Sequence, residues 1–319
     1  MKSSKLSWVP ECSGFLLACL LAFNLQIFFL STPVSSASLD LPITGTMEGL
    51  IKLGEGFVKK PEDMTVDSNG LLYTATKDGW IKRMYKNETW ENWKFLNSST
   101  LLGMAITKEN DLVVCDSAYG LFKVNDESTT ILANGLSFPN DVIAASDDTL
   151  YFTIASSKYT PLQYYVDLVE GKPNGQLMKY DPSTKEVSVV IDGFYFANGI
   201  ALSKDEDYVI VCESWKFRCR KYWLEGEKKG QLEIFIDNLP GGPDNINIAP
   251  DGNFWISLIK MNATGVQALQ NCSENKILLA AYPELIGLLI PMGITAPATA
   301  VKVTTDGEII MEYSDPNAT

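Results

Sequence analysis

The sequence contains no histidine, and this absence excludes several kinds of active site. Without an imidazole there can be no Ser-His-Asp triad and no Cys-His nucleophile pair. A zinc centre with histidine ligands is excluded for the same reason. Any general base in this protein must therefore be something other than an imidazole, and we consider a carboxylate or a metal-bound hydroxide.

The sequence is also poor in positive charge. Its 26 Lys and Arg residues face 39 Asp and Glu residues, which gives a net charge of −13. Polyanions and anionic membrane surfaces repel so acidic a chain, so we expect no nucleic acid and no such membrane among its partners. Hydrophobic residues make up 46% of the 319 positions, enough for a sizeable core, and the length allows one or two domains.

The N-terminal region has the order of a secretory leader. Basic residues precede an apolar stretch over 15–30, and small residues follow it. We predict a signal peptide over 1–37, cleaved near Ser36 or Ala37, and a mature chain over 38–319. An uncleaved anchor is the alternative, but the stretch is shorter than the roughly 20 residues of a membrane span. We therefore expect no stable span and a place in the secretory pathway: the vacuole, the endoplasmic reticulum or the outside of the cell.

Sequons and cysteines agree with that route. Glycosylation acceptors of the form Asn-x-Ser/Thr occur at Asn87, Asn97, Asn262, Asn271 and Asn317. Beyond the leader the cysteines are Cys115, Cys212, Cys219 and Cys272. In an oxidising compartment, Cys212 and Cys219 could bridge two neighbouring strands. Buried free thiols are the other reading, since pairing cannot be read from a sequence.

One short unit recurs along the chain. In four places an Asp, Glu or Asn precedes a short apolar run, and a turn rich in Asp, Asn and Gly follows the run. The turn residue lies eight positions after the polar residue in each case. The four pairs are Glu62 and Gly70, Asn140 and Asp148, Asn198 and Glu206, and Asp244 and Gly252. Two weaker copies begin at Gly103 and Ala298, eight residues before Asp111 and Asp306. A unit repeated in this way indicates an array of like elements.

The spacing of the turns predicts an all-β fold, a six-bladed β-propeller. The turns lie near residues 70, 111, 148, 206, 252 and 306, and short strands joined by tight turns fill the intervals. Units of this size are typical of propeller blades. The sixth unit has room for two strands only. We therefore expect an incomplete last blade, completed by residues 39–58, with a truncated C-terminus as the alternative.

Two units are longer than the others. Residues 156–175 interrupt the third blade and residues 259–297 the fifth, both with aromatic and apolar segments. Long loops in compact domains often cover a functional site. We expect helical or loop insertions that act as lids on one face, with packing against blade edges as the alternative.

The repeated polar residues suggest a metal site. The first strand of each propeller blade starts at the central axis, so residues at the same offset converge there. Glu62, Asn140, Asn198, Asp244 and Asn245 would form a ring of carboxylate and amide oxygens, and such ligands suit Ca²⁺. The same side chains also act as turn formers that bond local backbone, which is the alternative. Asp63 and Asp141, each next in line, would support the ligands or be solvated.

Three segments carry a resemblance to a known family. They are residues 174–182 (Asn-Gly-Gln-Leu-Met-Lys-Tyr-Asp-Pro), residues 195–199 (Tyr-Phe-Ala-Asn-Gly), and residues 212–223, which begin Cys-Glu and end Arg-Lys-Tyr-Trp. Over most of residues 45–315 the chain resembles the plant strictosidine synthase-like proteins, which are related to calcium-dependent lactonases and phosphotriesterases with six-bladed propellers. The resemblance implies that the ring residues lie where the hydrolase branch holds its catalytic calcium. Two features differ: the glutamate of the true synthases and the histidine bases of the mammalian hydrolases have no counterpart here.

These observations predict a calcium-dependent hydrolase of small esters, lactones or phosphoesters. Ca²⁺ would polarise the substrate, and Glu62 or Asp244 would be the catalytic base. Tyr151, Glu213 and Tyr164 are candidates for the substrate pocket, with ordinary blade packing as the alternative. Two other functions stay open: an amine–aldehyde condensing enzyme of alkaloid biosynthesis, and a non-catalytic glycoprotein that binds through its propeller face. We expect a monomer with a small-molecule substrate.

Overall fold

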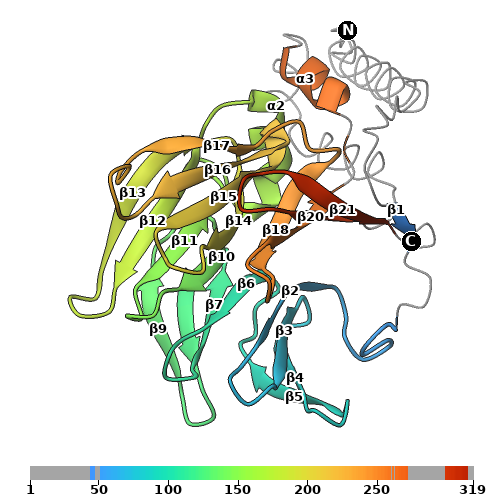
Figure 1. The fold of residues 1–319 in the computed structure, drawn as a ribbon. Coiled ribbons are helices and arrows are strands. Elements are labelled where there is room, and N and C mark those ends of the chain that lie inside the picture. Colours follow the sequence, from blue (N-terminus) through green and yellow to red (C-terminus); the bar gives the residue numbers. More distant parts are fainter. Residues whose placement is uncertain (1–43, 47–50, 260, 262, 272–298, 315–319) are drawn as a thin grey trace, which may run out of the picture.

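The computed structural model describes residues 44–46, 51–259, 261, 263–271 and 299–314. Within them the strands form five sheets arranged around a common axis, as in a propeller (Figure 1). We call the sheets blades 1 to 5 in chain order. The first strands of successive blades lie next to one another around the axis. The predicted leader, Asn262, Asn317 and Cys272 lie outside the described residues.

Each of the first four blades is an antiparallel sheet of four consecutive strands. Blade 1 contains β2 (Pro61–Val66), β3 (Leu72–Thr76), β4 (Trp80–Met84) and β5 (Trp90–Phe95). Blade 2 contains β6 (Leu101–Ile106), β7 (Leu112–Asp116), β8 (Gly120–Val124) and β9 (Thr129–Asn134). Blade 3 contains β10 (Pro139–Ala144), β11 (Leu150–Ile154), β12 (Gly175–Asp181) and β13 (Glu186–Phe194). Blade 4 contains β14 (Ala197–Leu202), β15 (Tyr208–Glu213), β16 (Arg218–Trp223) and β17 (Leu232–Ile236).

Blade 5 joins the two ends of the described chain. Its strands are β18 (Gly242–Ile248), β19 (Phe254–Ile259), β20 (Thr299–Val303) and β21 (Ile309–Ser314). The short strand β1 (Thr44–Thr46) pairs in parallel with β21 at the outer edge. The N-terminal segment therefore supplies an edge strand, as predicted, but it completes blade 5 and not a sixth blade.

The prediction of six blades is not confirmed in the described residues, which form five. The segment expected to open a sixth unit, residues 301–303, lies in β20, the third strand of blade 5. The turn between β20 and β21 has the Gly307 amide donating to the Thr304 carbonyl at 3.0 Å, just as the Gly252 amide donates to Ala249 at 2.9 Å. Because both hairpins of a blade can close with the same turn, the pattern in the sequence does not distinguish the first hairpin from the second.

Every inner strand carries a β-bulge at the same register position. Two residues of the inner strand lie opposite one residue of the second strand, a geometry that bends the strand and re-aims its side chains. The bulged pairs are Glu62 and Asp63, Leu102 and Gly103, Asn140 and Asp141, Asn198 and Gly199, and Asp244 and Asn245. The residue opposite each pair is small: Ala75, Cys115, Thr153, Cys212 and Ser257.

The bulge explains the step of eight. Eight residues after the first bulged residue, the turn contains a residue in the left-handed backbone conformation. These residues are Gly70, Asn110, Asp148, Glu206 and Gly252. In blade 2 the unit therefore begins at Leu102 and not at Gly103, which corrects the weak copy identified in the sequence by one residue.

Apolar side chains just after each bulge pack against the preceding blade. Met104, Val142, Ile200 and Ile246 each belong to a buried cluster shared by two neighbouring blades. Burying side chains of this kind stabilises a fold by roughly 1.5–3 kcal/mol each. Met64 has the same position in blade 1 and is 58% exposed, because no described blade precedes it.

The two insertions meet at one end of the molecule. The first contains the 3₁₀ turn η1 (Pro161–Gln163) and α2 (Tyr164–Glu170), and the second contains α3 (Ala263–Asn271). Figure 1 shows α2 and α3 beside each other, and the Gln270 amide donates to the Leu168 carbonyl at 3.0 Å. A second 3₁₀ turn, η2 (Ser214–Lys216), follows β15. None of the helices in the described residues is long and apolar enough to cross a membrane.

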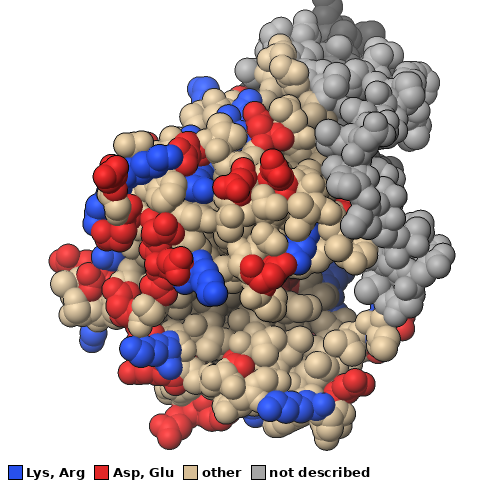
Figure 2. Space-filling model, in the orientation of Figure 1, with Lys and Arg blue, Asp and Glu red and all other residues tan. Residues whose placement is uncertain are grey.

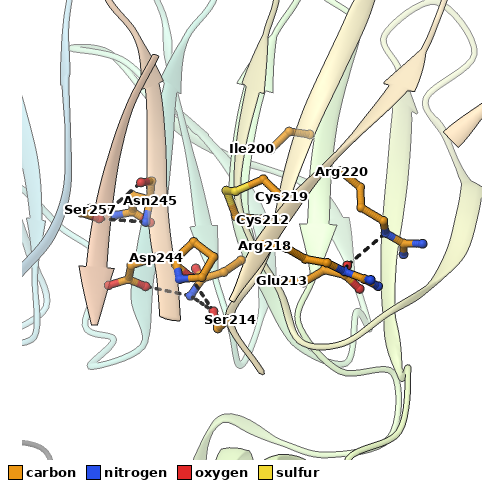
Figure 3. Close-up of a disulfide and its surroundings, with 12 residues drawn as sticks. Ile200, Cys212, Glu213, Ser214, Arg218, Cys219, Arg220, Asp244, Asn245 and Ser257 are labelled. Carbon is orange, nitrogen blue, oxygen red and sulfur yellow. Dashed lines mark hydrogen bonds and ion pairs between the residues drawn. A yellow bond between two sulfur atoms is a disulfide. The ribbon is translucent and has the colours of Figure 1, made fainter. Parts of the chain in front are cut away.

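A disulfide joins Cys212 of β15 to Cys219 of β16, which lie directly opposite each other in the sheet (Figure 3). Of the alternatives left open by the sequence, the cross-strand bridge is therefore the observed one. Cys115 is a buried free thiol.

The inner strands approach so closely that two bulge positions leave no room for a side chain. A Cβ at Gly103 would lie 2.2 Å from the Asp141 carboxylate. A Cβ at Gly199 would lie 2.5 Å from the Asp244 carbonyl oxygen and 2.6 Å from the Ile246 amide nitrogen. Glycine is needed here for close packing of neighbouring blades, not for an unusual backbone conformation.

We expect Gly199→Ala to destabilise the protein by about 3 kcal/mol, because the new methyl group must push blades 4 and 5 apart. Gly135→Ala is the control. Its φ is 72° and nothing lies within 4 Å of the added Cβ, so only the left-handed backbone cost of about 1–2 kcal/mol applies. Urea unfolding of both variants measures the difference. If both variants lost the same free energy of unfolding, contact between the blades would not be the reason for glycine at position 199.

Candidate metal centre

The first bulged residues place one side chain from each blade at the same level of the axis. They are Glu62, Leu102, Asn140, Asn198 and Asp244, and Asn245 follows in blade 5. The Asn198 Nδ2 donates to the Asp244 Oδ1 at 2.7 Å, which links blades 4 and 5. The Asn245 Nδ2 donates to the Glu62 carbonyl oxygen at 2.9 Å, which links blades 5 and 1. The bulges thus put the five residues predicted as metal ligands at one end of the inner strands, and these two bonds join four of them.

Four of these side chains have a buried oxygen without a hydrogen-bond partner. The atoms are Glu62 Oε2, Asn140 Oδ1, Asn198 Oδ1 and Asn245 Oδ1. Leaving a buried polar atom unpaired costs about 1–3 kcal/mol, so most such atoms find a partner. Four unpaired oxygens at one place therefore fit a site built to hold a cation, and hard oxygen ligands of this kind suit Ca²⁺.

The amide orientations are consistent with this role. The Asn198 Nδ2 is occupied by Asp244 and by Ser214, whose Oγ accepts at 3.0 Å. Ser214 is itself held by the bond from its hydroxyl to the Pro243 carbonyl at 2.7 Å. With both hydrogens of the amide engaged, only the oxygen of Asn198 is free to face a cation. Ser214 lies outside the repeat, so no pattern in the sequence indicated this positioning role.

Burial and mutual repulsion act on the carboxylates around the axis. Burial raises the pKa of Glu62 well above its usual range, and the carboxylates of Asp244, Asp63 and Asp141 raise it further. Burial also raises the pKa of Asp244, against the hydrogen bond from Asn198. Burial raises the pKa of Asp63 to about 6 and, with repulsion from Asp63, raises that of Asp141. A bound cation would favour the ionised form of each group.

Asp63 and Asp141 are not solvated. The Asp63 Oδ2 accepts the Met104 amide at 2.8 Å, and the Asp141 Oδ2 accepts the Ile200 amide at 2.9 Å. Each carboxylate therefore reaches from its own blade to the next. They join the blades immediately beside the oxygen ring.

The ring is interrupted in blade 2. Leu102 has the ring position there and packs against apolar side chains of the neighbouring clusters. In the part of the chain that the structure describes, no three acidic or cysteine side chains form a metal-binding group. The candidate site depends instead on two carboxylates, Glu62 and Asp244, and on three amides.

The three residues predicted to line a substrate pocket lie in different surroundings. Tyr164 begins α2, is half-buried and packs on the apolar cluster under the insertions, where it meets Tyr165 edge-on at 5.9 Å. Tyr151 lies near the far end of blade 3, where it pairs with Ile143 in β10. The structure does not bring Tyr151 to the ring.

Glu213 is completely buried at the end of β15. Its Oε2 lies 2.5 Å from the Arg218 Nε and 3.1 Å from the Arg220 Nε, and its Oε1 accepts the Tyr195 amide at 2.8 Å (Figure 3). With two guanidinium partners and a backbone bond, this carboxylate holds the strand ends of blade 4 together.

An aromatic cluster adjoins the ring at the end where the inner strands begin. Phe138 and Phe196 immediately precede β10 and β14, and Phe196 stacks on Trp215 at 4.2 Å. Asp167 of α2 is buried beside them and accepts the Trp215 indole N–H at 3.0 Å. The first insertion is therefore anchored on the face that carries the ring. Sequence reasoning identified the insertion but not these anchoring residues.

The predicted glycosylation sites in the described residues are exposed. Asn87, Asn97 and Asn271 all lie at the surface. Asn87 is in the hairpin between β4 and β5, where its Oδ1 accepts the Thr89 amide at 3.2 Å. On the face drawn in Figure 2, acidic side chains are numerous and interspersed with Lys and Arg.

The chain matches two family descriptions: strictosidine synthase over residues 140–227, and strictosidine synthase-like, N-terminal, over residues 46–84. It is similar to Protein STRICTOSIDINE SYNTHASE-LIKE 4 of Arabidopsis thaliana, with 35% identity over 281 residues that cover 82% of this chain and 73% of the relative.

Two solved structures have a similar fold. One is a gluconolactonase from Xanthomonas campestris, with a TM-score of 0.58, 14% identity and coverage of 82% of this chain and 78% of the other. The second is a calcium-binding regucalcin from Agrobacterium tumefaciens, with a TM-score of 0.54, 16% identity and coverage of 81% and 75%. At these identities the likeness concerns the fold alone. The sequence relationship, by contrast, covers most of the chain, and the chain belongs to the strictosidine synthase-like family.

Proposed function

We propose that this protein is a calcium-dependent hydrolase of small esters, lactones or phosphoesters. The observation that carries the proposal is the set of four buried, unpaired oxygens on Glu62, Asn140, Asn198 and Asn245. Asp244 adds a second carboxylate, held by Asn198 at 2.7 Å. Two carboxylates and three amides supply five oxygen ligands, and a bidentate carboxylate or water would complete the six to eight that Ca²⁺ takes, without the rigid geometry that smaller cations require.

Calcium, when bound there, would supply Lewis-acid polarisation of a carbonyl or phosphoryl oxygen. The residues themselves supply the base. Burial raises the pKa of Glu62 and Asp244 in the cation-free site, and a bound cation would keep both carboxylates ionised, so either can accept a proton from water. In this proposal a carboxylate takes the role of general base that an imidazole has in enzymes with histidine. Tyr164 and the first insertion, to which it belongs, lie on the same face and would help to exclude water.

The family relationship and the shared fold support the proposal without deciding it. A gluconolactonase and a calcium-binding regucalcin are built on the same kind of propeller. The amine–aldehyde condensation suggested by the family name remains the alternative enzyme activity, and the activity assay below includes it.

We further propose that the protein travels through the secretory pathway, to the vacuole or beyond, as a glycosylated monomer. The disulfide between Cys212 and Cys219 supports an oxidising compartment. The exposed sequons at Asn87, Asn97 and Asn271 support glycosylation there, and the same is proposed for Asn262 and Asn317.

Calcium should raise both the stability and the activity of the wild-type protein. At about 100 times its dissociation constant, calcium would add about 2.7 kcal/mol to the free energy of unfolding. Thermal unfolding with calcium or chelator, beside hydrolysis of a lactone, an aryl ester and an organophosphate, measures both effects. Condensation of an amine with an aldehyde is assayed in parallel. Unchanged unfolding and no hydrolysis would overturn the proposal.

Asn140→Ala is the sharpest variant, because the Asn140 oxygen has no partner in the protein. Removing it should weaken calcium binding by about tenfold or more, as the loss of a metal-orienting group does. The stability of the calcium-free protein should stay the same or rise, because an unpaired buried atom is removed. Asn92→Ala, which removes an exposed amide in β5, is the control and should change neither property. A loss of calcium-free stability in Asn140→Ala would instead indicate a structural side chain.

Without calcium, ionisation of Asp63 should cost stability. Its pKa is about 6 in the folded protein and about 3.9 in an unfolded chain, so the folded state binds the proton more tightly. The stabilisation is present below pH 4 and is lost as the pH rises through 6. Relative to Asp63→Asn, the wild type should lose about 2 kcal/mol across this interval in chelator, measured by urea unfolding. A difference that does not change with pH would contradict this.

A further inference from the structure

Hydrogen bonds between turns join the blades at the end of the inner strands opposite the oxygen ring. The left-handed turn residue of one blade accepts from the turn of the blade before it. Asn110 Oδ1 accepts the Ser68 amide at 3.0 Å, Asp148 Oδ1 the Lys108 amide at 2.9 Å, and Glu206 Oε1 the Ser146 amide at 2.8 Å. Each amide belongs to the sixth residue after the first bulged residue. Three successive blade pairs are therefore connected by the same oxygen-to-amide bond.

The series stops between blades 4 and 5. The equivalent turn residue of blade 5 is Gly252, which has φ of 85° like the others but has no side chain. The equivalent amide of blade 4 is that of Lys204, for which no hydrogen-bond partner is found in the described residues. Nothing lies within 4 Å of a Cβ added at Gly252. The space that an acceptor side chain would fill is therefore open.

A cavity of about 350 Å³ lies at this break. Lys204 and Gly252 are on its wall, and the remaining surface is mostly apolar, with Ile143, Leu202, Ile248 and Pro250 among the lining residues. Ligand cavities are typically apolar with a few placed polar groups, and this volume is at the small end of their range. Lys204, whose amide has no partner in the described residues, contributes a polar group to this lining.

We propose that this cavity binds a small apolar monocarboxylate. The carboxylate takes the place that the oxygens of Asn110, Asp148 and Glu206 have in the other blade pairs, and accepts the Lys204 amide. The hydrocarbon part contacts Leu202 and Ile248. The proposed contact between an acceptor oxygen and a backbone amide is thus one that three side chains of this protein already make.

Charge supports an anionic ligand at this position. Lys204 lines the cavity, is exposed and makes no ion pair in the described residues. Of the acids in the adjoining turns, Glu206 is engaged with Ser146 and Asp251 with Lys302 at 2.6 Å, while Asp205 makes no ion pair in the described residues. Backbone amides bind carboxylates strongly because the acceptor is charged.

This site is separate from the oxygen ring. The ring lies at the bulges where β10, β14 and β18 begin, whereas the cavity lies at the turns that follow the same strands. The two sites can therefore be altered independently. Failure of one proposal leaves the other intact.

Calorimetric titration of the full protein with butanoate, hexanoate, octanoate and benzoate tests the proposal, with octylammonium as the charge-reversed probe. We expect saturable binding of at least one carboxylate and none of octylammonium. Gly252→Asn should weaken that binding by about tenfold or more, because the new amide fills the space and accepts the Lys204 amide itself. The backbone permits this change, since Asn110 has the same conformation.

Two variants at position 204 separate the amide from the ammonium. Lys204→Pro deletes the amide hydrogen in a turn that accepts proline, because Pro250 has the equivalent place in blade 5. Lys204→Ala keeps the amide and removes the ammonium, and should weaken binding less than Lys204→Pro does. Gly226→Asn is the control, at a left-handed glycine with open space in the hairpin between β16 and β17. No saturable binding of any carboxylate, or equal binding by wild type and Gly252→Asn, would overturn the proposal.

Discussion

The close approach of the inner strands at the axis is the constraint on which the rest of this structure depends. At Gly103 and Gly199 there is no room for a Cβ, because the backbone or carboxylate of the next blade is already there. Asp63 and Asp141, which alternate with these glycines from blade to blade, reach across to amides of the following blade. Glycine in one blade and aspartate in the next are thus two parts of one packing arrangement. It brings polar side chains together where water has little access.

Because of this close packing, the carboxylates of the candidate metal centre are costly to keep ionised without a cation. Four carboxylates lie around the axis, and burial raises the pKa of each. Asp63 and Asp141 are partly compensated by backbone amides, but Glu62 keeps an unpaired oxygen. Either a cation or protons would offset the free-energy cost of these buried charges. Such a site suits acid–base chemistry in a protein without histidine.

The sequence predicted the ring because its residues recur at a fixed distance from a turn, and both ends of that interval have physical causes. The bulge sets one end, and the left-handed turn residue sets the other. The sequence did not separate one hairpin from another, so β20 was expected to open a new blade. It also could not find Ser214 or the arginine partners of Glu213, because those contacts join segments that do not repeat.

The repeat has one departure at each end of the inner strands, and the two have different effects. At the bulge end, Leu102 replaces a polar side chain, and the oxygen ring is interrupted at blade 2. At the turn end, Gly252 replaces an oxygen acceptor, and the Lys204 amide of blade 4, beside the cavity, has no partner in the described residues. At the bulge end, the oxygens without a partner belong to the blades that keep the polar residue of the repeat. At the turn end, by contrast, the repeat satisfies its amides from blade to blade, and only the blade pair that lacks the acceptor leaves an amide without a partner in the described residues. The repeat therefore creates one candidate binding site by agreement and the other by a departure.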